Sequence, residues 1–131
     1  MTLIVPNSGE AVLLALALSE DVILKLYSND VTPGENSVVS DFTEVAGAGY
    51  AAKTLSSDAW NIVTGDPSVA SYAYQDFQFT GPTTAPSTVY GYFVVNAAGV
   101  LLWAERFNEL VVPFSPVIGT VVRITPKLSM S

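Results

Sequence analysis

The stretch Thr88–Phe107, TVYGYFVVNAAGVLLWAERF, decides the fold that this sequence predicts. β-Branched and aromatic residues dominate its two halves, Val89–Val95 and Val100–Phe107, and such residues favour strands. Between the halves lies Asn96–Gly99, which ends in the glycine typical of a tight hairpin turn. Both apolar runs are nearly continuous, which indicates strands covered on two faces, for instance by a second sheet and by a neighbouring subunit.

Upstream of the hairpin, the sequence predicts an extended arm and one short helix. Met1–Pro6 is the arm, and Asn7 is expected to cap a helix in which Glu10 stands three residues further on. The run AVLLALAL over 11–18 is apolar on every side, so we expect this helix to be buried against the sheet or between subunits. Arm and helix occupy residues 1–20 of a single domain that spans 1–131.

Short strands are predicted along the rest of the chain, at Val22–Tyr27, Tyr50–Leu55, Trp60–Val63, Ser68–Tyr74, Phe77–Thr80, Val111–Phe114 and Thr120–Ile124. A loop is predicted over 28–36, and 38–45 is expected to be either one helical turn or an irregular segment, of which we favour the loop. Pro126 is expected at an edge or a bulge, because proline cannot donate to a strand ladder. One helix and many closely spaced strands predict an all-β fold, an antiparallel β-sandwich that we expect to be jelly-roll-like.

The residue types that most often carry chemistry are absent from the sequence. Without cysteine there are no disulfides, thiolate metal sites or thiol nucleophiles, and without histidine the usual zinc ligand and general base are missing. Acid–base work by Asp41 with Glu44, or by Asp76 with Glu105, needs two carboxyl groups about 5–9.5 Å apart across a cleft. We interpret these carboxylates as solvated or capping groups, and we expect no enzyme activity, no cofactor and no metal.

The charge balance argues against nucleic acid as a partner. Five Lys and Arg residues oppose twelve Asp and Glu, which gives a net charge of −7, and the five cations are scattered singly. Charged residues form only 13% of the chain and apolar ones 50%, whereas about a quarter charged is usual. Such a composition suits either a core-rich sandwich with a Ser, Thr and Asn surface or a surface covered in an assembly, and we favour the assembly.

The hydrophobicity of the chain does not predict a membrane partner. Its longest apolar run, 11–18, has eight residues, against about 20 for a helix that crosses a bilayer. No Lys or Arg precedes that run, and Glu10 stands directly before it, which is unlike a secretion signal. We therefore expect the chain to be made in the cytoplasm and not to be processed.

Five segments spread over nearly the whole chain carry a resemblance to a known family: 3–10, 24–33, 41–51, 89–107 and 125–128. With these segments the sequence resembles small virion structural proteins of tailed bacteriophages, of the capsid decoration or cement type. The resemblance implies a β-rich subunit, homotrimeric, that sits on the capsid lattice or elsewhere on the virion. None of the five segments has a catalytic meaning.

A cement protein stabilises a shell by burying apolar surface between subunits. We expect the contacts to other copies and to the major capsid protein at Leu3, Ile4, Val5, Val12, Leu13, Leu16, Trp103 and Arg106. The alternative is a tail or head-fibre component that recognises a host glycan through exposed tyrosine and tryptophan side chains. Solvent-facing aromatic residues in a groove would favour that alternative, and a dry aromatic core would not.

Overall fold

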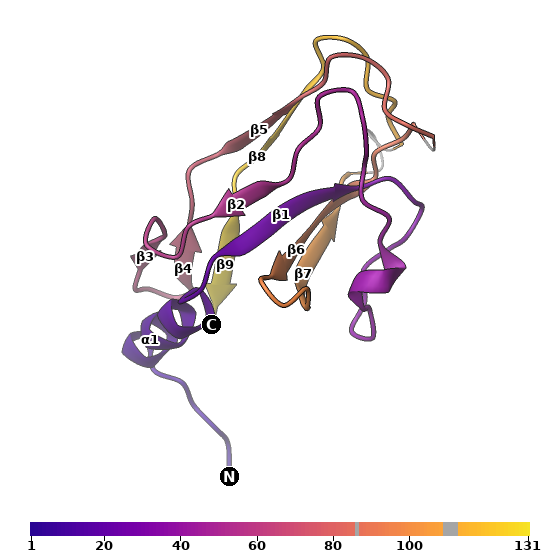
Figure 1. Ribbon diagram of the computed structural model, residues 1–131. Coiled ribbons are helices and arrows are strands. Elements are labelled where there is room, and N and C mark those ends of the chain that lie inside the picture. Colours follow the sequence, from indigo (N-terminus) through magenta and orange to yellow (C-terminus); the bar gives the residue numbers. More distant parts are fainter. Residues whose placement is uncertain (86, 109–112) are drawn as a thin grey trace.

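The computed structural model describes residues 1–85, 87–108 and 113–131 (Figure 1). Within these ranges the chain is mostly antiparallel β, with one short helix, as the sequence predicts. The elements in chain order are α1 (Asn7–Ala17), β1 (Val22–Tyr27), the 3₁₀ turn η1 (Val39–Asp41), β2 (Lys53–Leu55), β3 (Asn61–Val63), β4 (Ser68–Ser71), β5 (Gln75–Gln78), β6 (Gly91–Asn96), β7 (Leu101–Arg106), β8 (Val121–Ile124) and β9 (Lys127–Met130).

The predicted hairpin is confirmed as β6 and β7, which form one side of a four-stranded antiparallel sheet in the order β2-β1-β6-β7. Gly99 closes the turn with a φ of +84°, a conformation that favours glycine, and donates its N–H to the Asn96 carbonyl at 2.9 Å. The pairing shifts between Val94↔Trp103 and Val95↔Leu101, so Leu102 is the extra residue of a bulge.

The remaining strands form a second, bent layer. β4 pairs with β9 and β5 pairs with β8, while β3 joins the other edge of β4. Tyr72 donates its backbone N–H to the Pro126 carbonyl at 3.0 Å between the two pairs, and the register changes there by one residue. β4–β5 and β8–β9 therefore form one long ribbon interrupted by a bulge, and the prediction that Pro126 lies at a bulge is confirmed.

Side chains from the four-stranded sheet and from the β5–β8 ribbon form the main core. Every second residue of β1 faces inward, so Leu24 and Leu26 meet Phe77 and Ile124 across the layers. The buried members of this core are Val22, Leu24, Leu26, Val45, Leu55, Phe77, Phe79, Val89, Tyr92, Val94 and Ile124.

The loop between β1 and β2 covers the other face of the four-stranded sheet. Its Phe42 stacks on Phe93 at 5.2 Å between ring centroids and meets the edge of Tyr27 at 5.0 Å. β6 is therefore buried on both faces by its own chain. β7 is an edge strand with Leu102 and Glu105 exposed, so within a single chain the predicted cover on two faces is found for β6 and not for β7, and cover of β7 by a neighbouring subunit stays a prediction.

The start of the helix differs from the prediction. α1 includes Asn7, and Pro6 is the N-cap without any side-chain cap bond. The Glu10 side chain, only 2% exposed, accepts the backbone N–H of Ser68 at 3.4 Å instead of closing a capping box. The capping prediction is wrong because a contact 58 residues away in sequence uses that carboxylate.

The helix is buried on one stripe only. Leu14 and Leu18 pack on Ala70, with Leu128 and Met130 alongside, whereas the opposite side of the helix is exposed. The prediction of burial on all sides is thus not met within a single chain, and burial between subunits stays a prediction.

Several strand boundaries also differ. The predicted strands at 50–55, 60–63 and 68–74 are shorter in the structure, β5 begins at Gln75 instead of Phe77, and β9 was not predicted. Of the predicted strand Val111–Phe114, residues 111–112 lie outside the described ranges, and Phe114 forms an isolated bridge with Val89. No helix in the described part of the chain is long and apolar enough to cross a bilayer.

Candidate interaction surfaces

The arm Met1–Pro6 extends away from the body of the molecule (Figure 1). Leu3 is 90% exposed and Ile4 is 77% exposed, while Val5 is partly buried. No hydrogen bond joins residues 1–5 to the rest of the chain as far as the structure describes it. Two large apolar side chains thus face solvent on a segment that is attached to the domain only through α1.

The outer side of α1 continues this exposed surface. Val12, Leu13 and Leu16 lie on one side of the helix and are all exposed. Residues 1–19 contain one charged side chain, Glu10, and it is buried. We name the set Leu3, Ile4, Val12, Leu13 and Leu16 the N-terminal apolar face.

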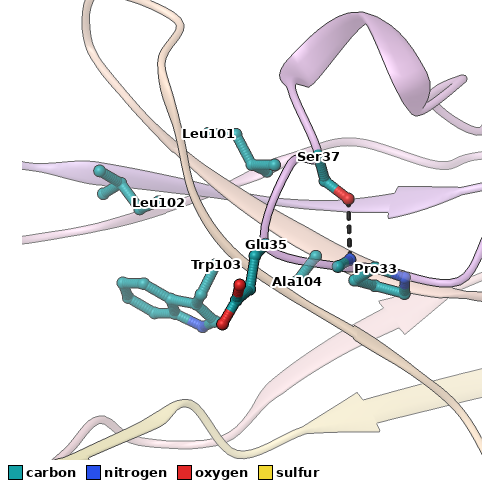
Figure 2. A pocket seen from close by; sticks show the side chains of 8 residues that line it. Pro33, Glu35, Ser37, Leu101, Leu102, Trp103 and Ala104 are labelled. Atoms are coloured by element: carbon teal, nitrogen blue, oxygen red, sulfur yellow. Dashed lines mark hydrogen bonds between the residues drawn. The ribbon is translucent and has the colours of Figure 1, made fainter.

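A second surface lies beside β7 and is called here the edge groove (Figure 2). It is a hollow of about 460 Å³ between the β1–β2 loop and β7, lined by Pro33, Gly34, Glu35, Ser37, Leu101, Leu102, Trp103 and Ala104. Side chains alternate between the two faces of a strand. Four consecutive β7 residues line the hollow, so it lies along the edge of the strand and not on one face.

The backbone of β7 is unpaired on the side of the edge groove. Phe107 donates its N–H to the Tyr90 carbonyl at 3.0 Å, toward β6. Because the two sides of a strand alternate, Ala104 and Arg106 present their backbone groups to the opposite side. No backbone hydrogen bond is formed there within the described ranges.

Hydrogen bonds hold the loop that forms the wall of the edge groove. Arg106 donates to the Asp30 carboxylate at 2.7 Å and to the Val31 carbonyl at 3.2 Å, and the Tyr27 hydroxyl donates to the same carbonyl at 3.1 Å. Within the loop, the Gly34 N–H donates to the Ser37 hydroxyl at 2.8 Å (Figure 2). The wall is thus tied to β1 and to β7 at several points.

The electrostatics of this anchor follow from burial and pairing. Burial raises the pKa of Tyr27 to about 12, an effect that the nearby Arg106 partly opposes. The bond to Asp30 raises the pKa of Arg106, whose guanidinium also lies 5.0 Å from the centre of the Tyr90 ring. Arg106, predicted as an interface residue, thus finds its partners in its own chain.

The edge groove continues toward the hairpin tip as a smaller hollow of about 290 Å³. Ser37 and Leu101 line both hollows. Val38, Val39 and Val100 supply exposed apolar side chains to the smaller one. A continuous channel therefore follows β7 and the turn before it, apolar toward the hairpin tip and with Glu35 as the charged side chain in the lining of the larger hollow.

Trp103 joins the core to the edge groove. Its ring lies 6.5 Å from that of Trp60 at a 70° angle, and it packs against both the main core and the cluster under α1. Other aromatic residues pack in the same way, with Tyr50 stacked on Phe77 and Trp60 against Tyr72. Tyr74 is exposed, and the guanidinium of Arg123 lies over its ring at 3.8 Å.

The carboxylates considered for acid–base work have structural partners. Asp41 accepts the backbone N–H of Val38 at 2.9 Å and so caps the 3₁₀ turn. Glu44 accepts the Tyr50 hydroxyl at 2.8 Å. Glu105 is exposed on β7, while Arg123 donates twice to Asp76, at 2.8 and 2.9 Å, and thereby lowers the pKa of Asp76.

The described residues contain no group of three or more carboxylates that could hold a metal ion.

Sequence reasoning found the N-terminal apolar face from its composition, but it missed the edge groove. Pro33–Ser37 and Leu101–Ala104 are about 65 residues apart in sequence, and only the turn signal at Pro33-Gly34 indicated that a loop would form.

Comparisons of the chain with models of known families, with curated proteins and with solved structures found no match.

Proposed function

We propose that this chain is a structural subunit of a tailed-phage virion, of the capsid decoration or cement type. In this role it binds copies of itself and the major capsid protein. The observation that supports this role best is the N-terminal apolar face, five exposed large apolar side chains in a segment whose one charged side chain is buried. Exposed apolar patches on small domains mark surfaces that bind other proteins.

The proposal extends to the fold and to the assembly. We take the two layers as a jelly-roll-like β-sandwich and the assembled subunit as a homotrimer located in the virion. The core between the four-stranded sheet and the β5–β8 ribbon is compatible with a sandwich. The resemblance of the sequence to decoration proteins is the reason for choosing a phage particle among possible assemblies.

The free energy of this function comes from burial. Each Å² of apolar surface removed from water contributes about 25 cal/mol, so covering several leucine-sized side chains stabilises a contact by several kcal/mol before the cost of ordering. A ligand that binds only the assembled shell shifts the equilibrium toward that shell. No catalytic group, metal or cofactor takes part in this mechanism.

Particle occupancy tests the proposal. Virions of the phage that encodes the chain are purified with the natural chain or with a variant that lacks residues 1–8, and copies per particle are counted by mass spectrometry. We expect the deletion to lower occupancy by about tenfold or more, because each 1.4 kcal/mol lost from a contact costs a factor of ten. Full occupancy of the deletion variant, or absence of the natural chain from the particles, overturns the proposal.

Tyr74→Ala provides the matched control. Tyr74 is exposed and belongs to none of the predicted capsid contacts, and it is the aromatic side chain on which a glycan-binding role would most directly depend. We expect the variant to keep full occupancy. Loss of binding to a glycan array by this variant, with occupancy unchanged, would instead support the alternative of a glycan-binding fibre component.

A further inference from the structure

We propose that the arm Met1–Pro6 of one copy adds as an extra strand to the open edge of β7 in a second copy, within the edge groove. The inference deepens the proposed function, because it names the acceptor of the arm. It leaves the outer side of α1, with Val12, Leu13 and Leu16, for the contact to the capsid protein.

The acceptor is an unpaired strand edge. Ala104 presents its backbone N–H and C=O groups to the groove, Arg106 presents its own on the same side of β7, and no backbone group in the described ranges bonds to them. Unpaired edges recruit extended segments, because main-chain hydrogen bonds form without regard to side-chain identity. The wall of the groove is fixed by the bonds of Arg106 to Asp30 and Val31, so the acceptor is formed before the arm arrives.

The donor matches the acceptor in length and conformation. Six residues form the arm and six form β7, and at about 3.3 Å per residue each spans roughly 20 Å. Pro6 has extended dihedral angles, φ −63° and ψ 158°, at the point where the arm meets α1. Proline lacks the N–H that a ladder needs, so pairing stops at Val5 and the helix follows.

The side chains and charges of donor and acceptor also agree. Along an added strand, Leu3 and Ile4 point to opposite faces, and the groove offers Pro33, Leu101 and Leu102 to receive apolar groups. Residues 1–9 and 97–104 contain no charged side chain. Glu35 is the one charged side chain in the lining of the groove and the arm carries no acidic side chain, so acid–acid repulsion between two copies of net charge −7 is small at this contact.

The opposite edge of the same sheet is a poorer acceptor. β2 forms this edge with three residues, Lys53–Leu55, and includes a lysine, whereas β7 has six residues. Short length and a charged side chain are two devices that protect strand edges from pairing. β2 therefore serves as the internal control for the proposed pairing.

The absence of cysteine from the chain makes disulfide mapping a clean test. An Ile4→Cys variant is mixed with a Leu102→Cys or an Ala104→Cys variant at about 100 µM under mild oxidation, and cross-linked peptides are identified by mass spectrometry. We expect linkage between position 4 and position 102 or 104 to exceed linkage to a Thr54→Cys control on β2 by about tenfold, because a disulfide requires Cα atoms about 4.4–6.8 Å apart. Equal or greater linkage to position 54 overturns the inference.

A second measurement does not depend on the choice of register. Sedimentation velocity compares the full chain with a variant lacking residues 1–6, and far-UV circular dichroism confirms that both are folded. We expect the full chain to associate and the variant to sediment as a monomer, while identical sedimentation of the two overturns the inference. Both measurements use the isolated protein, so they are independent of the virion experiment. A chain that is found in virions but shows no linkage contradicts the arm pairing alone. A chain that shows the linkage but is absent from virions contradicts the proposed function alone.

Discussion

Gly91 lies where the ring of Tyr27 leaves no room for a side chain. The two residues are paired across β1 and β6, and a Cβ at position 91 would lie 2.7 Å from a ring carbon and 2.7 Å from the hydroxyl oxygen of Tyr27, and too close to the Glu105 carbonyl. We expect Gly91→Ala to lower the free energy of unfolding by about 1–3 kcal/mol, the usual cost of overpacking. Urea denaturation of the variant and of the natural chain measures this difference in the free energy of unfolding.

Gly81→Ala is the control for this substitution, since a Cβ at that position meets nothing within 4 Å. We expect its effect to stay within about 0.5 kcal/mol. Equal losses in the two variants would contradict the contacts at position 91 as the cause, since the effect of Gly→Ala on the unfolded chain alone raises the free energy of unfolding.

Tyr27 also makes stability depend on pH in the alkaline range. Burial raises its pKa from 10.0 to about 12 in the folded chain, so its contribution is fully present below pH 10 and is lost as pH rises through 12. Between these values the unfolded chain releases a proton that the folded chain keeps, which lowers the free energy of unfolding by up to about 1.4 kcal/mol per pH unit.

We expect Tyr27→Phe to reduce this slope, measured by urea denaturation at several pH values from 9 to 11.5. The variant also loses the hydrogen bond to the Val31 carbonyl, but that loss shifts the whole curve and leaves its slope unchanged. A slope identical to that of the natural chain would contradict the assignment, and Tyr50, whose pKa burial also raises, would become the next candidate.

Among the elements, α1 has two sides that predict opposite responses. Leu14 is 0% exposed and packs in the cluster with Ala70, whereas Leu16, two residues on, is 64% exposed. We expect Leu14→Ala to cost about 2–5 kcal/mol of unfolding free energy and Leu16→Ala less than about 0.5 kcal/mol. Thermal or chemical denaturation of the dilute protein measures both, and equal costs would contradict the described placement of the helix.

The hairpin shows which elements the sequence can predict. Val89–Val95 and Val100–Phe107 carry strong strand formers on both sides of a turn that ends in Gly99, and this local signal was sufficient. β9 was missed because Pro126 pointed to an interruption, and the sequence contains no sign that the ribbon resumes after a bulge.

The candidate surfaces divide in the same way. Exposure of Leu3 and Leu16 agrees with the interface predicted from composition, since an apolar segment without charges is visible in sequence. The edge groove depends on the Asp30–Arg106 bond, which joins residues 76 apart, and no local pattern indicates such a contact. Glu10 illustrates the same limit, because its side chain accepts the backbone N–H of Ser68 instead of capping the helix as predicted.

At the level of the whole molecule, the charge of −7 predicts how association responds to salt. Charges separated by more than about 10 Å are screened at 0.1 M salt, so repulsion between copies weakens while apolar contacts remain. We expect raising the salt from about 0.02 to 0.3 M to strengthen self-association by about threefold or more, as measured by sedimentation equilibrium.

The variant lacking residues 1–6 is the control, and we expect it to remain monomeric at both salt concentrations. Association that weakens as salt increases would indicate that ion pairs hold the copies together. That outcome would contradict an interface held together by the apolar side chains of residues 1–9 and 97–104.

Phe42 and the loop that carries it seal the outer side of β6 from within the same polypeptide. The core around β6 is therefore complete in the isolated chain and needs no contact with another subunit. In the proposed role, newly made chains accumulate as complete building blocks, and their addition to a particle requires the ordering of the arm alone instead of the folding of a domain. In that role the chain can be synthesised and folded well before the particle that it joins is assembled.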